Sequence, residues 1–131
     1  MPATGVSGVD LYVKNGSDGQ WHFTARDIDW KFGDTICYTF RPAGGDVREC
    51  KLYLPLYNHV EWMEMGVDSA SQFEWVPYDE TCPIVAYGTS ILQGGCASRP
   101  GMAWTNILSR RPQYPLMNLG FSGNGQMDPE V

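Results

Sequence analysis

Ser90 follows a predicted strand, at a position where its hydroxyl group could act as a nucleophile. Residues 82–87 read Cys-Pro-Ile-Val-Ala-Tyr, a continuous apolar run typical of a strand buried on both faces of a parallel sheet. Gly88, Thr89 and Ser90 follow this run. Open α/β sheets bind their ligands beyond the carboxyl ends of such strands, so Ser90 is a candidate nucleophile. The alternative is that Ser90 belongs to a turn or caps a helix, as serines in such positions often do.

A glycine-rich loop follows the next predicted strand. Residues 115–119 are a short apolar strand, and residues 120–125 after it read Gly-Phe-Ser-Gly-Asn-Gly. Between the two strands, residues 100–111 predict a helix that begins at a proline and has two arginines in its last turn. A right-handed crossover of this kind brings both loops to the same edge of the sheet. Glycines there allow close approach and exposed N–H groups, as an oxyanion hole requires, and this favours the nucleophile over the turn residue.

The residues before this βαβ unit predict antiparallel β-structure. Apolar residues recur with a period near two, and turn clusters such as residues 14–19 interrupt them. The pattern predicts a mostly β chain, with an antiparallel, jelly-roll-like β-sandwich in residues 1–78 and a βαβ unit in residues 79–131. The expected strands of the sandwich are residues 9–13, 21–25, 35–40, 50–54, 59–67 and 73–76.

The composition excludes several classes of protein. Of 131 residues 43% are hydrophobic and 18% charged, which is too apolar for a disordered chain. The net charge of −6 argues against nucleic acid as a partner, because phosphate binding needs clustered Lys and Arg. No run of 18 apolar residues predicts a membrane span, and the first thirty residues do not resemble an export signal.

The four cysteines do not have the spacing of a metal site. Cys37, Cys50, Cys82 and Cys96 form no Cys-x-x-Cys pair and have no paired histidines nearby, so we expect no metal and no cofactor. We expect free thiols, because a chain of this size can form its core without disulfides. Two disulfides are the alternative, and pairing of Cys37 with Cys50 across neighbouring strands stays open.

Three short stretches resemble conserved blocks of the SGNH (GDSL-like) hydrolases. Residues 88–95, Gly-Thr-Ser-Ile-Leu-Gln-Gly-Gly, resemble the first block, and residues 118–124, Asn-Leu-Gly-Phe-Ser-Gly-Asn, resemble the second. Residues 8–12, Gly-Val-Asp-Leu-Tyr, resemble the signature of a β-domain that precedes the catalytic domain in one branch of acyl esterases, largely from bacteria. Residues 54–58 and 97–104 fit that branch too. The resemblance thus covers almost the whole chain and implies that a flavodoxin-like catalytic domain begins near residue 79.

The resemblance assigns roles to two residues. Ser90 matches the nucleophile, whose own N–H is one oxyanion donor, and Gly123 matches the second donor. Thr89 stands where the family has an aspartate, but that aspartate is not the acid of the catalytic triad. The third oxyanion donor, in a Gly-x-Asn block, and the Asp and His of an Asp-x-x-His block are absent from this sequence. We therefore expect an N-terminal portion of a serine esterase that is inactive by itself, since a serine without a base is a weak nucleophile.

The resemblance also implies a class of substrate. Esters of short acyl groups, O-acetyl groups on carbohydrate among them, are the expected substrates. The alternative is a non-catalytic β-sandwich module that binds a glycan or a protein partner. Strands 84–87 and 116–119 would have unpaired edges in a truncated sheet, which predicts a homo-oligomer. The family is often secreted or periplasmic, but this chain shows no signal, so its location stays open.

Other residues have two interpretations each. Arg99 could orient a substrate carboxylate or sugar hydroxyl, or it could hold its loop through a salt bridge. His22 and His59 fall in predicted strands and are expected to be strand or contact residues rather than bases. Four tryptophans could form a platform for sugar rings, but we expect most of them in the core or at a domain interface. They are Trp21, Trp30, Trp62 and Trp75.

Overall fold

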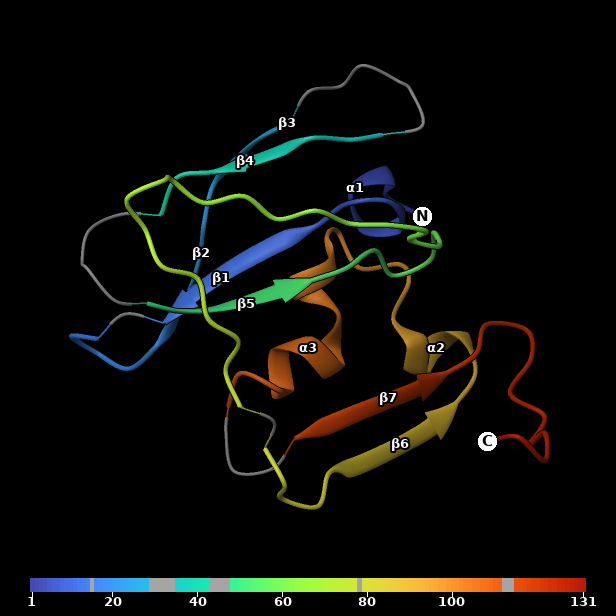
Figure 1. Cartoon of the computed structure of the whole chain (residues 1–131). Coiled ribbons are helices and arrows are strands. Elements are labelled where there is room, and N and C mark those ends of the chain that lie inside the picture. Colours follow the sequence, from blue (N-terminus) through green and yellow to red (C-terminus); the bar gives the residue numbers. More distant parts are fainter. Residues whose placement is uncertain (15, 29–34, 43–47, 78, 112–114) are drawn as a thin grey trace.

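The described part of the chain folds into three small sheets and several short helices (Figure 1). The structure is a computed structural model that describes all residues except 15, 29–34, 43–47, 78 and 112–114. Two of the sheets are antiparallel and belong to the first half of the chain, and the third is a parallel pair. The prediction of a mostly β chain that ends in a βαβ unit is therefore confirmed, whereas a jelly-roll arrangement stays a prediction.

The largest sheet has the strand order β2-β1-β5 and contains the small apolar core of the N-terminal half. β1 (Asp10–Lys14) pairs antiparallel with β2 (Trp21–Phe23) and with β5 (Glu49–Tyr53). β1 and β2 form an antiparallel hairpin on either side of the predicted turn cluster, and Gly19 in that cluster has a positive φ of 66°. Tyr12 and Tyr53 are buried on this sheet with their ring centroids 5.5 Å apart, in an edge-on contact.

The second antiparallel sheet is a two-stranded ribbon. β3 (Arg26–Ile28) pairs with β4 (Tyr38–Phe40), with Asp27 opposite Thr39. β4 is the end of the strand predicted over residues 35–40, and β3 was not predicted as a separate strand. Trp30, one of the four tryptophans considered above, lies outside the described residues.

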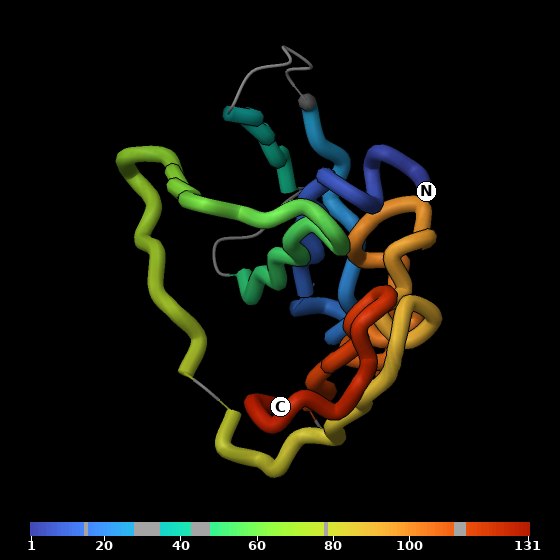
Figure 2. The backbone as a smooth tube through the Cα atoms, turned by 90° about the vertical axis from the view of Figure 1, so that its right-hand side faces the viewer, coloured from blue at the N-terminus to red at the C-terminus, as the bar shows by residue number. Residues whose placement is uncertain are grey.

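Residues 59–83, the connecting segment, form no strand in their described part. The strands predicted over residues 59–67 and 73–76 are therefore wrong. Figure 2 shows the segment, green to yellow, running along the outside of the molecule between β5 and β6. Trp62 and Trp75 are exposed by 59% and 75%, so the expectation of packing in the core or at a domain interface is wrong for these two residues. Alternating apolar residues form a strand only where they can pair with a neighbouring strand and pack on an apolar surface. The described residues provide neither along this segment.

The C-terminal half forms the predicted parallel pair. β6 (Ile84–Gly88) lies beside β7 (Leu116–Gly120), with Ile84 opposite Leu116 and Gly88 opposite Gly120. The crossover contains α2 (Ser90–Gln93), a 3₁₀ turn η1 (Pro100–Met102) and α3 (Trp104–Leu108). The single helix predicted over residues 100–111 is thus broken, at Ala103, where ψ is 137°.

The helices of the crossover lie between the three-stranded sheet and the parallel pair (Figure 1). On the sheet side, the Tyr53 hydroxyl donates to the carbonyl of Asn106 at 3.2 Å, and Lys51 Nζ donates to the carbonyl of Ser109 at 3.3 Å. The guanidinium of Arg110 lies 4.0 Å from the centroid of the Tyr12 ring. The two halves of the chain therefore share one interface, in which small and polar groups are prominent.

The remaining sequence predictions concern thiols, membranes and metals. Cys37, Cys50, Cys82 and Cys96 are free and exposed, as the favoured interpretation predicted. Within the described ranges, no helix has the length and apolar character needed to cross a bilayer. The same ranges contain no group of three His, Cys, Asp or Glu side chains that could hold a metal ion.

Additional short contacts tie the first residues of the chain to the crossover. The short helix α1 (Ala3–Val6) precedes β1, and a Cβ added at Gly5 would overlap the carbonyl of Ala97. The hydroxyl of Thr4 donates to the carbonyl of Ser98. A side chain and a backbone carbonyl that are 94 positions apart in the sequence are thus hydrogen-bonded at this point.

Candidate active site

Ser90 is the first residue of α2 and follows directly on β6. The N-cap of this helix is Thr89, with extended backbone angles of φ −101° and ψ −150°, and it makes no side-chain capping bond. Ser90 is exposed, and in the described part of the chain its hydroxyl has no hydrogen-bond partner. The structure therefore does not use Ser90 as a helix cap, and its oxygen is accessible to a ligand.

The loop after β7 begins beside the loop that carries Ser90. Gly88 and Gly120 are opposite each other at the ends of the parallel strands, and the N–H of Phe121 donates to the carbonyl of Gly88 at 2.9 Å. A side chain at Gly120 would overlap the backbone nitrogen of Gln93, so only glycine allows β7 to end this close to α2. The predicted convergence of the two loops is therefore confirmed, on the contacts of their first residues.

Gly123 lies at the exposed tip of the second loop. Its φ is +75°, and the turn around it is closed by the N–H of Asn124, which donates to the carbonyl of Phe121 at 3.0 Å. The N–H of Gly123 donates to no acceptor that the structure describes. An N–H without an acceptor at this exposed position could serve as an oxyanion donor.

Two polar side chains join α2 to this loop, and sequence reasoning did not assign them. The Gln93 side chain accepts a hydrogen bond from the N–H of Ser122 at 2.9 Å. Asn118, in β7, accepts one from the N–H of Gly120 at 2.9 Å and donates to the carbonyl of Leu92 in α2 at 3.3 Å. A polar residue inside the apolar strand 115–119 is the signal that could have identified Asn118.

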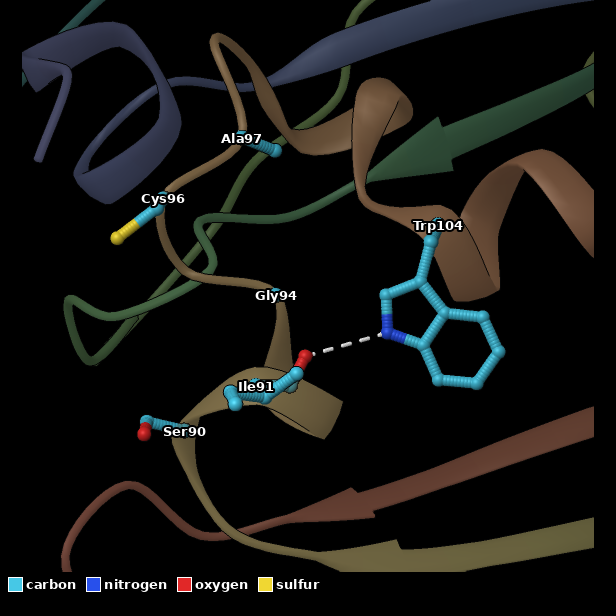
Figure 3. Close-up of a pocket in the computed structure, with 6 residues that line it drawn as sticks. All are labelled: Ser90, Ile91, Gly94, Cys96, Ala97 and Trp104. Atoms are coloured by element: carbon cyan, nitrogen blue, oxygen red, sulfur yellow. Dashed lines mark hydrogen bonds between the residues drawn. The ribbon is translucent and has the colours of Figure 1, made fainter.

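A pocket of about 390 Å³ opens next to Ser90 (Figure 3). The indole nitrogen of Trp104 donates to the carbonyls of Ile91 at 3.3 Å and Leu92 at 3.1 Å, which holds the ring against α2. In Figure 3 the side chains of Ser90 and Cys96 lie at the end of the pocket that is farthest from Trp104. The lining residues are Ser90, Ile91, Gly94, Cys96, Ala97 and Trp104. The wall beside the serine is mostly apolar and open, and it suits a small apolar group.

The carboxylate of Asp10 joins the two halves of the chain. Asp10 has no exposed surface and contacts both Arg26 and Arg99, the latter at 3.2 Å; we call these three residues the Asp10 ion cluster. Asp10 also accepts the N–H of Gly101 at 2.8 Å. A Cβ at Gly101 would overlap the ring of Tyr12, so the third and fifth residues of the stretch Gly8–Tyr12 both contact the loop that follows α2.

Arg99 is held inside the protein rather than in the pocket. Its guanidinium donates to the Tyr12 hydroxyl at 2.8 Å and lies 3.8 Å from the centroid of the Phe23 ring. Burial opposes its charge, but the hydrogen bonds and charges of Tyr12 and Asp10 outweigh that effect, so the pKa of Arg99 is raised. Of the two interpretations of Arg99, these contacts agree with the one in which it holds its loop through a salt bridge.

The two histidines are not hydrogen-bonded to Ser90. His22 pairs with Asp18 at 2.8 Å on the exposed β1–β2 hairpin, and His59 is exposed at the start of the connecting segment. The N–H of Gln20, and then His22, lower the pKa of Asp18 below its usual value. The described residues therefore offer Ser90 no partner that could take its proton.

Comparisons with known proteins agree with this arrangement. Residues 1–73 match the family described as the N-terminus of SGNH-hydrolase-type esterases (GxDLY), and residues 81–131 match the GDSL-like Lipase/Acylhydrolase family. A crystal structure from Bacteroides ovatus, described as a GDSL-like lipase, is 43% identical with a TM-score of 0.75. The match covers 98% of this chain and 37% of that one, so the chain spans little more than a third of its relative. No curated protein matches the sequence.

Proposed function

Because the chain belongs to the SGNH-hydrolase type of esterases, we propose that it carries the nucleophile and two oxyanion donors of a serine esterase. The observation that supports this most directly is the position of Ser90, exposed and without a hydrogen bond to any described group. It lies beside a loop whose Gly123 N–H is free. The two loops start at paired positions of β6 and β7, so both contribute to one site.

The proposed reaction is ester hydrolysis through an acyl-enzyme. Ser90 Oγ attacks the ester carbonyl while a general base takes its proton, and the carbonyl oxygen becomes an oxyanion that accepts the N–H groups of Ser90 and Gly123. Collapse breaks the bond to the alcohol, which leaves with the proton returned by the base. Water then attacks the acyl-serine in the same way and releases the carboxylic acid, which restores the Ser90 hydroxyl.

The base of this reaction would have to come from outside these 131 residues. The sequence contains no Asp-x-x-His and no Gly-x-Asn block. His22 pairs with Asp18, and in the described residues neither His22 nor His59 is hydrogen-bonded to Ser90. Without a base at hydrogen-bond distance, the serine stays protonated and reacts slowly. We therefore propose that the 131 residues alone have almost no esterase activity.

The proposed substrates are esters of short acyl groups, with acetyl groups on carbohydrate as the first case to examine. The pocket beside Ser90 supports a small apolar acyl group, because Ile91, Ala97 and Trp104 are among its lining residues and Ser90 is exposed. A large alcohol such as a sugar chain could remain outside while the acyl group enters.

Activity of the gene product and its serine variant tests the proposal. The protein encoded by the whole open reading frame around these residues should hydrolyse p-nitrophenyl acetate and react with a fluorophosphonate at Ser90. Ser90→Ala should abolish both, whereas Ser98→Ala, at an exposed serine of the same loop region, should leave both unchanged. The 131-residue chain should show neither reaction. Labelling of Ser90 in that short chain would contradict the claim that the serine is unactivated.

The exposed aromatic residues of the connecting segment favour a second candidate function. Phe73 and Trp75 contact each other edge-on with centroids 5.2 Å apart, and Trp75 is exposed by 75%. Aromatic faces in this state can stack on sugar rings, as in a glycan-binding module. Oligosaccharide titrations followed by tryptophan fluorescence, with Trp75→Ala as the comparison, separate this function from catalysis, because binding should then be independent of Ser90.

A further inference from the structure

The side-chain amide of Gln93 bridges two parts of the molecule that are distant in sequence. Its Oε1 accepts the N–H of Ser122 at 2.9 Å, and its Nε2 donates to the carbonyl of Leu56 at 2.8 Å. The two partners fix which end of the amide is oxygen, because Ser122 N–H can only donate and a carbonyl can only accept. Gln93 is therefore held at both ends of its amide group.

The bond to Ser122 acts directly on the loop that carries Gly123. Ser122 and Gly123 are the two central residues of the turn between Phe121 and Asn124. Holding the nitrogen of Ser122 fixes the start of this turn, and the peptide unit that follows carries the N–H of Gly123. Because Gln93 ends the four-residue helix that Ser90 begins, the same side chain sets the separation between Ser90 and the turn.

The bond to Leu56 fixes the side chain from the other direction. Leu56 follows β5, and its own N–H donates to the carbonyl of Gly5 at 3.1 Å. The acceptor of Gln93 is thus itself held by the first residues of the chain. The N-terminal half is thus linked to the candidate oxyanion loop through the side chain of Gln93.

We infer that Gln93 is a positioning residue of the oxyanion hole, which holds the Ser122–Gly123 turn at a fixed distance from Ser90 and takes its own orientation from Leu56. This inference rests on the proposed function, which makes the Ser122–Gly123 turn part of an oxyanion hole. The hydrogen bonds of Gln93 do not depend on that function. Gln93 touches no reacting atom in this assignment. It acts through the peptide group beside Gly123.

Amide hydrogen exchange on the 131-residue chain tests the structural half of the inference. Gln93→Met keeps the length of the side chain and removes both bonds, so exchange at Ser122 should become about tenfold faster. Gln93→Glu keeps an acceptor for Ser122 but loses the donor to the carbonyl of Leu56, so it should preserve part of the protection. Gln72→Met makes the same change at an exposed residue of the connecting segment and should alter nothing. Protection at Val13, in the centre of the three-stranded sheet, reports any global loss of stability.

Two exchange results would overturn the inference. Unchanged protection of Ser122 in Gln93→Met would mean that the bond is not formed in solution. Equal loss in Gln93→Met and Gln93→Glu would mean that the carbonyl-type oxygen is not what holds the turn.

Kinetics of the complete gene product test the functional half. If Gln93 orients an oxyanion donor, Gln93→Met should lower kcat about 10- to 100-fold with KM within about twofold, since the donor matters mainly in the transition state. Gln93→Glu should recover part of kcat. Full kcat in Gln93→Met would overturn the positioning role. Activity that survives Ser90→Ala would instead overturn the proposed function, and it would leave the exchange results unaffected.

Discussion

Asp10 is a buried carboxylate with cationic partners from both halves of the chain. Arg26 and Arg99 have side-chain exposures of only 8% and 27%, and Asp10 has none. A buried charge that loses its partner costs much more than an exposed one, because the remaining charges cannot be solvated. The contribution of Asp10 should therefore differ sharply from that of the surface ion pair on the same sheet.

Replacement of Asp10 by alanine should lower the free energy of unfolding by about 3–5 kcal/mol. Arg26 and Arg99 would keep their charges in a largely buried site, and the N–H of Gly101 would lose its acceptor. Urea unfolding followed by far-ultraviolet circular dichroism measures the change, and Asp10→Asn provides a version of nearly the same volume.

Glu49→Ala is the matched control for that measurement. Glu49 pairs with Lys14 at 3.2 Å on the same sheet, but the two side chains are 40% and 42% exposed. Its loss should cost less than about 1 kcal/mol. Equal effects of the two substitutions would contradict the assignment of Asp10 as a buried centre of charge.

At the scale of single residues, the sequence predicts the candidate site only in part. Ser90 and the glycine loop are found because strand ends and glycines are local signals that precede any tertiary contact. Gln93 could not be assigned in the same way, since its partners are 29 and 37 positions away and either bond means little alone. Arg99 has two interpretations in the sequence, because a guanidinium suits a ligand and a buried carboxylate equally well.

Helices and strands can likewise be predicted where local sequence determines them, and not where distant contacts do. The parallel pair β6–β7 is predictable, because a continuous apolar run before a loop and a crossover has few other structures available. The break at Ala103 is not predictable from helical spacing. Gly101, Ala103 and Thr105 face the interface, whereas Trp104 and Leu108 remain 41% and 43% exposed. Small residues are buried there because the ring of Tyr12 approaches the backbone.

Gly101→Ala tests this close approach. A Cβ at that position would overlap the ring of Tyr12, so the substitution should destabilise the chain by about 1–3 kcal/mol through overpacking. Thermal unfolding by calorimetry gives the change. Gly66→Ala, where an added Cβ meets nothing within 4 Å, should stay within about 0.5 kcal/mol. In a Tyr12→Leu background the cost of Gly101→Ala should shrink, and a cost that persists there would point to backbone strain instead.

For the whole molecule, the parallel pair suggests self-association. In the described chain β6 and β7 pair only with each other, and Val85 and Met117 are 54% and 45% exposed. Unpaired strand edges with apolar side chains readily pair with another chain. We predict a dimer at high micromolar concentration, measured by size-exclusion chromatography with light scattering.

Two lysine substitutions identify the surface involved. Val85→Lys should return the protein to a monomer, because a charge on β6 opposes pairing. Trp75→Lys, on the connecting segment, should leave the dimer intact. A strictly monomeric unmodified chain would contradict the prediction. Dissociation of the dimer by Trp75→Lys but not by Val85→Lys would assign the contact to the connecting segment.

The connecting segment should be the first part of the chain to be cleaved by chymotrypsin. Its described residues are largely exposed and belong to no sheet, so a protease can reach an extended backbone near Trp62, Phe73 and Trp75. Mass spectrometry after brief digestion should find early cuts between residues 59 and 83. Trypsin, which has no Lys or Arg in that range, should act more slowly. Early tryptic cuts at Lys51 or Arg99 would contradict the expectation that the connecting segment opens before the rest of the chain.

The Asp10 ion cluster also restricts how this protein can be recombined with its relatives. A chimera that takes residues 1–58 from one esterase and the Ser90 half from another inherits the carboxylate from one parent and the cation from the other. Such a hybrid should assemble only when both parents have an acid at position 10 and an arginine at position 99. A library that exchanges the two halves freely will therefore be enriched in survivors that carry this pair, and the pair can serve as the first criterion for choosing parents.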